Sequence, residues 1–152
     1  LFAPQDVGRK TEEIARDCYN RARANVAEAE QVLKRLSEKY PLVLVSNFYG
    51  NISRVLDDFG IGKYFKEVIE SAVVEIRKPD PRIFEKGVEA LGLSPEEVLV
   101  VGDSYKKDIL PAQEAGCRTL WLKGRGWTAE EDAVIHPGII GSLDDILGLL
   151  LK

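Results

Sequence analysis

The sequence has no methionine, one histidine and two cysteines among its 152 residues. Because a primary translation product begins with methionine, we expect either that the first residue was removed or that the chain starts partway into a longer protein. Two cysteines, Cys18 and Cys117, are too few for a disulfide scaffold, so we expect a reducing compartment, with the cytoplasm as the default location. The first ten residues lack the basic start and apolar stretch of a signal peptide.

Long apolar runs and an excess of basic residues are also absent. No run approaches the roughly eighteen apolar residues of a membrane-spanning helix, so we expect no membrane partner. The formal net charge of −4 argues against a nucleic-acid backbone as the main partner. What remains, 45% hydrophobic and 30% charged residues, is the composition of one ordinary globular domain that is long enough to bury a core.

Short apolar runs alternate with helical patterns along the chain. Strands are predicted at residues 42–45, 68–71, 98–101 and 118–122, with a last one at 139–140. Helices are predicted at residues 9–39, 52–59, 81–91, 107–115 and 143–151. This alternation with short connections predicts an α/β fold, a parallel sheet with helices on both faces.

Local signals set several expected boundaries. Asn25, followed by Glu28 at the third position, fits a capping box and predicts a break in the first helix near Ala24. The fully apolar run Leu42–Val45 is typical of a strand buried on both faces. Glycines predict three helix ends and two polar residues predict N-caps: Gly60, Gly92, Gly116, Asp80 and Ser142.

Polar side chains follow two of the predicted strands, at the sheet edge where ligands bind in open parallel sheets. Ser46 and Asn47 end the first strand, Asp103 ends the third, and Asp108 lies five residues further on. Lys78 lies between them in a loop bounded by proline. Carboxylates suit a hard cation such as Mg²⁺, and a lysine with a hydroxyl suits phosphate oxygens. A metal and a phosphate at one site are typical of phosphoryl transfer.

These residues resemble three motifs of the haloacid dehalogenase-like superfamily of hydrolases. The apolar strand 42–45 ending in Ser46-Asn47 is similar to its second motif, and Lys78-Pro79 before a helix is similar to its third. Strand 98–101 followed by Gly102-Asp103, four residues and Asp108 is similar to its fourth, the most specific of them. The resemblance covers about residues 26–152 and implies a Rossmann-like three-layer core.

The resemblance also implies a role for each residue. Ser46 would hydrogen-bond the transferring phosphoryl group, and Asn47 would help to position the substrate. Lys78 would neutralise negative charge on the phosphate and the nucleophile. Asp103 would bind Mg²⁺, and Asp108 would bind it through water or orient Lys78. The other singular side chains suit structural roles: Trp121 as core, His136 as incidental, and both cysteines as small apolar fillers.

The sequence departs from the family in its first motif. That motif is an apolar strand followed by Asp-x-Asp, which supplies the nucleophile and the general acid–base, and no Asp-x-Asp occurs in the sequence. The resemblance therefore implies that residues 1–24 are the remnant of a helical cap and that residues 25–152 are an incomplete core. The absent strand would lie between the strands ending in Ser46 and Asp103. A second chain or a missing segment would complete the sheet, or the two strands would close up and pair.

The function expected of the complete protein is Mg²⁺-dependent hydrolysis of a small phosphorylated metabolite, a phosphate monoester, through an aspartyl-phosphate. The chain alone is expected to be inactive because the nucleophile and the general acid are absent. One alternative is a non-catalytic domain of the same fold that binds metal, phosphate or a protein partner. Another is a true haloacid dehalogenase, for which the metal is not needed; the Gly-Asp pattern around Asp103 favours the metal-dependent branch.

Overall fold

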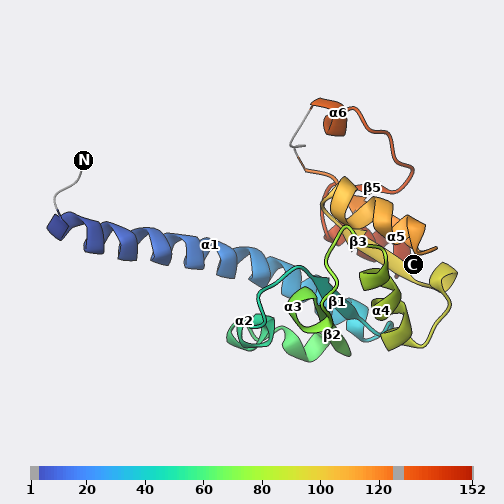
Figure 1. Ribbon diagram of the computed structural model, residues 1–152, viewed down its shortest axis with the longest axis horizontal. Helices are drawn as coiled ribbons and strands as arrows, with labels where there is room; N and C mark the ends of the chain where they lie inside the picture. The colour runs from blue at the N-terminus through green and yellow to red at the C-terminus, as the bar shows by residue number, and fades with distance from the viewer. Residues whose placement is uncertain (1–3, 125–128, 152) are drawn as a thin grey trace.

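The computed structural model describes residues 4–124 and 129–151. Helices and strands alternate along most of it, as Figure 1 shows. The first half contains α1 (Pro4–Ser37), β1 (Val43–Ser46), α2 (Ile52–Asp58), η1 (Gly62–Tyr64), β2 (Glu67–Glu70), α3 (Ser71–Val74) and α4 (Arg82–Leu91). The second half contains η2 (Pro95–Glu97), β3 (Leu99–Gly102), η3 (Tyr105–Ile109), α5 (Leu110–Glu114), β4 (Arg118–Leu122), α6 (Ala129–Asp132), β5 (Ile139–Ile140) and α7 (Asp144–Leu150).

The strands form two parallel sheets. One pairs β1 with β2, and the other has the order β3-β4-β5. The predicted α/β class with parallel pairing is therefore confirmed. Within the described ranges β1 and β3 do not pair with each other, so the closed-up arrangement of these two strands is not observed.

Helices cover both faces of the first sheet, as the period-two alternation of strand side chains requires. Val43 and Val45 of β1 pack against a cluster that contains Phe84 and Val88 of α4. Leu44, which points to the opposite face, packs with Leu33 of α1 and with the helix α2. The loop 46–51 that leaves β1 is thus carried by a strand fixed from both faces.

The burial of β1 and β3 differs from the prediction. All four residues of β1 are only half-buried, and Val101 of β3 is 37% exposed. The expectation that residues 42–45 are buried on both faces is therefore met in part, because helices cover both faces of β1 but its residues are only half-buried. The reason is that, among the described residues, each of these strands has a strand neighbour on one side only.

The first helix is longer and more continuous than predicted. It runs without a break through Ala24 and Asn25, so the predicted interruption is wrong. Neither residue stops a helix, and the capping-box pattern acts only where a chain enters a helix from another conformation. The C-terminal part packs its Val32 against β5 and α7, whereas the N-terminal part projects from the body (Figure 1) and leaves Ile14 exposed.

The three helix ends predicted at glycines are correct, whereas of the two predicted N-caps only Asp80 accepts a hydrogen bond at a helix start. Gly60, Gly92 and Gly116 all adopt positive φ after a helix. Asp80 accepts a hydrogen bond from the backbone N–H of Arg82 at the start of α4. The predicted cap by Ser142 is wrong: a carboxylate inside α7, that of Asp145, accepts the N–H groups of Gly141 and Ser142 instead.

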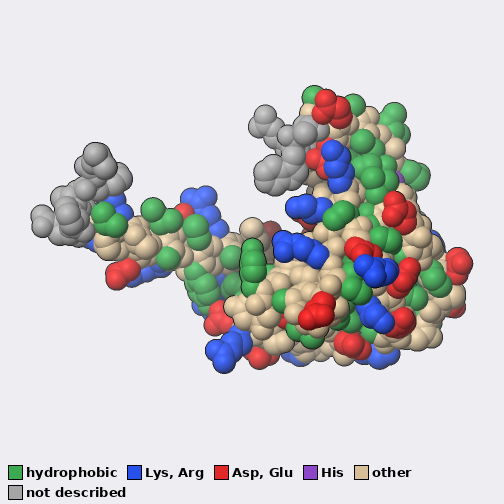
Figure 2. Space-filling model, viewed as in Figure 1, with side chains coloured by type: hydrophobic (Ala, Val, Ile, Leu, Met, Phe, Trp, Pro, Cys, Tyr) green, Lys and Arg blue, Asp and Glu red, His purple; other side chains and the backbone are tan. Residues whose placement is uncertain are grey.

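The surface of the body has no single-sign character in the view of Figure 2, where acidic and basic side chains are mixed. None of the helices formed by residues 4–124 and 129–151 has the length and apolar character needed to cross a bilayer.

Candidate active site

The centre of the candidate site is an ion pair between Lys78 and Asp108. Lys78 lies in the loop before α4, and Asp108 lies in η3, a turn of π-helix after β3. The Lys78 Nζ atom lies 2.7 Å from Asp108 Oδ1, and the two side chains are only 16% and 9% exposed. The other carboxylate oxygen, Oδ2, accepts the N–H of Ser104 at 3.0 Å. Both oxygens of Asp108 are therefore bonded, one of them to Lys78, and the orienting role of Asp108 stays a prediction.

Gly102, the last residue of β3, makes room for this ion pair. A Cβ atom at this position would lie 2.3 Å from the Cβ of Asp108, far inside contact distance. Only glycine therefore fits at the end of β3 with the Asp108 side chain where it is. This is the physical reason for the glycine in the Gly-Asp pattern.

Asn47 fixes the position of the Lys78 backbone. Its Nδ2 donates to the Lys78 carbonyl at 3.1 Å, and its Oδ1 accepts the Lys78 N–H at 2.9 Å. The peptide bond between Lys78 and Pro79 is cis. Since both polar atoms of the Asn47 side chain are engaged in this contact, the amide ties the end of β1 to the lysine loop; its contact with a substrate stays a prediction.

Two residues that sequence analysis did not single out hold the loop after β1 from its other side. The Glu70 side chain, at the end of β2 and only 5% exposed as a residue, accepts the N–H groups of Gly50 and Ile52. The adjacent Ser71 hydroxyl donates to the Phe48 carbonyl at 3.2 Å. The sequence indicates this pair of contacts, called here the Glu70 clamp, only by a carboxylate at the end of an apolar strand.

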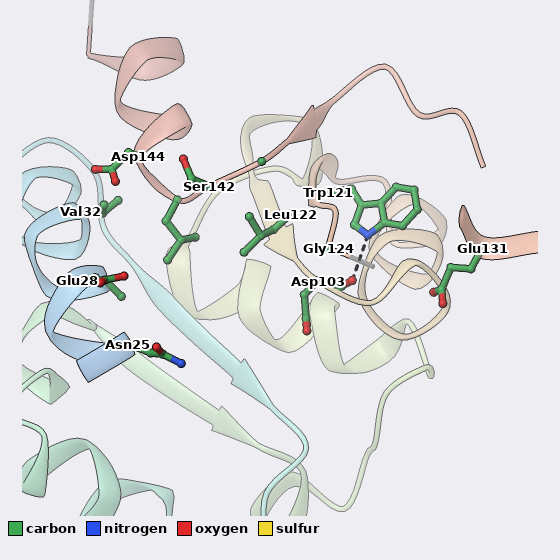
Figure 3. Close-up of a pocket in the computed structure, with 13 residues that line it drawn as sticks. Asn25, Glu28, Val32, Asp103, Trp121, Leu122, Gly124, Glu131, Ser142 and Asp144 are labelled. Atoms are coloured by element: carbon green, nitrogen blue, oxygen red, sulfur yellow. Dashed lines mark hydrogen bonds between the residues drawn. The ribbon is translucent and has the colours of Figure 1, made fainter. Parts of the chain in front are cut away.

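Two polar side chains at this sheet edge remain unbonded. The half-buried Ser46 hydroxyl and the exposed Asp103 carboxylate make no hydrogen bond or ion pair within the part of the chain that the structure describes. The backbone carbonyl of Asp103 is held, however, because it accepts the indole N–H of Trp121 at 3.1 Å (Figure 3). Trp121 is 2% exposed, as its predicted place in the core requires.

Asp103 borders a cavity of about 440 Å³. Figure 3 shows residues of α1, among them Asn25 and Glu28, on one side of this cavity and Asp103 with Leu122 on the other. No cluster of three or more histidine, cysteine or acidic residues suited to a metal occurs among the described residues. Proteins hold Mg²⁺ by one or two carboxylates together with water and substrate phosphates. Asp103 offers one such carboxylate at the cavity, and its role as a metal ligand stays a prediction.

A chain of hydrogen bonds links the ends of β1 and β3 across the two sheets. Asn47 bonds the Lys78 backbone, the Lys78 amine bonds Asp108, and Asp108 bonds the Ser104 N–H. The network places the largely buried Lys78 ammonium between β1, which ends at the Ser46 hydroxyl, and β3, which is followed by the Asp103 carboxylate. Such a set can bind an anion on one side and a cation on the other.

Three further titratable side chains were expected to have structural or incidental roles: His136, Cys117 and Cys18. His136 is buried and bonds the Thr119 hydroxyl and the Gly138 N–H, so it orders the segment before β5 rather than being incidental. Burial raises the pKa of the Cys117 thiol, which agrees with a filler and disfavours a nucleophile. Cys18 is exposed on α1, so its predicted role as a filler is wrong.

Comparisons with known proteins agree with the motif resemblance. A family model described as haloacid dehalogenase-like hydrolase matches residues 6–116. A phosphoserine phosphatase of Thermus thermophilus is 33% identical over 129 residues, which are 84% of this chain and 49% of that protein. The chain thus spans about half the length of this relative.

Solved structures show the same similarity. A putative HAD-hydrolase of Bacillus subtilis, described as bound to magnesium, is 25% identical with a TM-score of 0.70, over 80% of this chain and 54% of that one. A 2-haloacid dehalogenase of Pseudomonas syringae is also 25% identical, with a TM-score of 0.66, over 80% and 50% of the two chains.

Proposed function

The chain belongs to the haloacid dehalogenase-like hydrolases, and on this basis we propose that it forms most of the active domain of a phosphatase acting on small phosphate monoesters. Its similarity to a phosphoserine phosphatase supports phosphoryl transfer as the reaction class. The observation that carries the proposal is the hydrogen-bond network from Asn47 through Lys78 to Asp108, which joins the two strand ends that the family uses.

In this proposal each side chain acts on the charge of the phosphoryl group. The Lys78 ammonium lowers the energy of the negative charge that develops on the phosphate oxygens, and the contact with Asp108 holds the ammonium in place. The Ser46 hydroxyl, which has no hydrogen-bond partner among residues 4–124 and 129–151, donates to a phosphoryl oxygen. Asn47 keeps Lys78 and Ser46 at a fixed separation because it is bonded to one and adjacent to the other.

Asp103 is the residue proposed to hold Mg²⁺. When bound there, the ion would neutralise phosphate charge and orient the phosphate. Asp108 is a weaker candidate for a direct ligand because both its oxygens already accept hydrogen bonds. The donors within this chain suit an ion whose other ligands are water and substrate.

The proposal requires the nucleophilic carboxylate of an Asp-x-Asp motif, which the sequence does not contain. We place it on an apolar strand that inserts between β1 and β3 and ends beside Ser46 and Asp103. The half-buried side chains of β1 and the exposed Val101 support this placement, since within the described residues each of the two strands pairs on one side only. Whether that strand belongs to the same polypeptide or to a second one, it completes the sheet in the same way.

Binding of orthophosphate to the chain in the presence of Mg²⁺, followed by ³¹P NMR, tests the proposal. We expect saturable binding that Lys78→Met weakens by about tenfold or more, because a charge-assisted hydrogen bond is lost. Lys86→Met is the matched control, since Lys86 pairs with Glu89 on the exposed side of α4. A wild-type chain that binds no phosphate contradicts the proposal.

The two alternative functions predict different results. For a dehalogenase, chloroacetate would compete with orthophosphate for binding, and chloroacetate binding would not depend on Mg²⁺. A non-catalytic phosphate-binding domain would also bind orthophosphate. A second assay separates it from a phosphatase: an apolar strand that ends in Asp-x-Asp is added to the chain, and hydrolysis of p-nitrophenyl phosphate is measured. The non-catalytic domain would stay inactive. The phosphatase proposal predicts that this addition produces hydrolysis.

A further inference from the structure

We propose that Trp121 is a positioning residue that aims the Asp103 carboxylate through its indole N–H. This inference rests on the proposed function, in which Asp103 holds Mg²⁺. Trp121 does not need to contact substrate or metal for this role. It acts on the backbone of the residue that does.

The register of the second sheet places Trp121 beside the relevant turn. In the pairing of β3 with β4, Gly102 lies opposite Trp121. The indole of Trp121 therefore starts from the strand position next to the end of β3 and reaches the carbonyl of the following residue, Asp103, at 3.1 Å. Figure 3 shows this hydrogen bond beside the cavity that Asp103 borders.

Trp121 is the one side chain that hydrogen-bonds Asp103 within the described part of the chain. The neighbouring residues of the turn are fixed by a different group. Asp108 accepts the Ser104 N–H and fills the space where Gly102 would carry a Cβ atom. The turn is thus held before and after Asp103 by Asp108, and at Asp103 itself by Trp121. Among the described residues, the Asp103 carboxylate makes no hydrogen bond and is available to bind a ligand.

The indole is itself held firmly, which is what a positioning role requires. Trp121 is 2% exposed, and its backbone N–H donates to Gly138 in the direction of β5. The Tyr105 ring lies 5.0 Å from its ring, and the Lys123 ammonium lies 4.8 Å from its centroid. A ring packed in this way has little freedom to rotate, so its N–H presents a fixed point to the Asp103 carbonyl.

Lys123 extends the contact to the end of α6 and to the segment that follows it. Its ammonium donates to the carbonyls of Asp132 and Val134 while it lies over the Trp121 ring. The turn that bears Asp103 is therefore connected, through one indole and one lysine, to a segment about thirty residues further along the chain. Trp121 is the common member of both contacts.

The test measures Mg²⁺ binding and backbone order in the ¹⁵N-labelled chain by NMR. Trp127→Phe leaves Trp121 as the only tryptophan, so its indole N–H signal is identified without ambiguity. In this background we expect Mg²⁺ to shift the Trp121 indole signal saturably, and Asp103→Asn to abolish the shift. This arm needs no change at Trp121 and so remains informative if a Trp121 variant fails to fold.

The second arm replaces Trp121 with Phe, which keeps a ring but removes the N–H. We expect the Mg²⁺ dissociation constant to rise several-fold, up to about tenfold, the range that one hydrogen bond supplies. We also expect the Ser104 amide to exchange several-fold faster relative to core amides such as Ile69. Thr119→Val is the matched control, because it removes a hydrogen bond from the same strand that is directed at His136 instead.

The outcomes separate this inference from the function on which it rests. Weaker Mg²⁺ binding and faster Ser104 exchange in Trp121→Phe, with neither change in Thr119→Val, support it. Unchanged binding and exchange in Trp121→Phe overturn it. If wild type does not respond to Mg²⁺ but Ser104 exchange rises only in Trp121→Phe, the positioning role stands and the metal part of the proposed function fails.

Discussion

The loop after β1 and the turn after β3 belong to different sheets and are joined by one hydrogen-bond network, but the polar groups they present differ in charge. The loop after β1 is tied by Asn47 on one side and by Glu70 on the other, and the Ser46 hydroxyl at the end of β1 makes no hydrogen bond among the described residues. The turn after β3 is tied by Asp108 and Trp121, and it leaves free a carboxylate, that of Asp103.

The difference shows how one site can bind an anion and a cation together. The neutral hydroxyl lies on the strand whose loop also fixes Lys78, so that side suits phosphate oxygens. The carboxylate side suits a hard cation. The Lys78–Asp108 pair joins the two sides, and it neutralises the charge of Asp108 while leaving that of Asp103 available. The predictions below test each side in turn.

The largest expected effect is on the rate of the completed enzyme, in which a strand with Asp-x-Asp is present. Lys78→Ala on the anion side and Asp103→Asn on the cation side should each lower kcat by roughly a thousand-fold, the loss that follows removal of a group aimed at transition-state charge. Hydrolysis of p-nitrophenyl phosphate measures both, with Lys86→Ala as the control. Loss of rate in only one of the two variants would contradict the view that both the anion side and the cation side contribute to catalysis.

The next effect is on the bridge between the two sides. Asp108→Ala leaves the Lys78 ammonium, 16% exposed, without its partner and should destabilise the chain by about 3–5 kcal/mol in urea unfolding. The double variant Lys78→Met/Asp108→Leu should recover most of this loss, since no buried charge is left unpaired. A loss in the double variant equal to that of Asp108→Ala would show that packing, not charge, explains the effect.

A smaller effect is expected where the loop after β1 is clamped. Glu70→Ala leaves the N–H groups of Gly50 and Ile52 without an acceptor and should cost about 1–3 kcal/mol. Glu70→Gln keeps an acceptor oxygen and should cost less. Amide exchange should rise at Gly50 and Ile52 but not at Ser104, because the turn after β3 has its own ties; a rise at both would contradict their independence.

The smallest effect is a gain in stability. Glu75, between β2 and Lys78, has φ of +57°, a left-handed conformation that costs an L-residue roughly 1–2 kcal/mol. Glu75→Gly should therefore stabilise the chain by about 1 kcal/mol in thermal unfolding, part of the relief being offset by glycine's greater freedom when unfolded. Glu85→Gly, at an exposed position inside α4, should instead cost about 1 kcal/mol. Equal changes in both variants would contradict the strain at Glu75.

Much of the fold follows from local patterns that the sequence carries. The apolar runs gave strands at or within one residue of their observed places, and 118–122 matches β4. Gly60, Gly92 and Gly116 end helices because only glycine takes positive φ there without strain. The helix break near Asn25 was predicted wrongly, since a capping pattern has no effect where packing and neighbouring turns keep the chain helical.

The sequence by itself determined which residues meet at the site. Because carboxyl ends of parallel strands share one edge, Asn47, Lys78 and Asp108 were expected near one another, and hydrogen bonds join them. The tertiary structure alone decided which of these groups are engaged and which are free. Glu70 and Trp121 reach the site from neighbouring strands by register, and such contacts depend on pairing between distant segments, which no local spacing encodes.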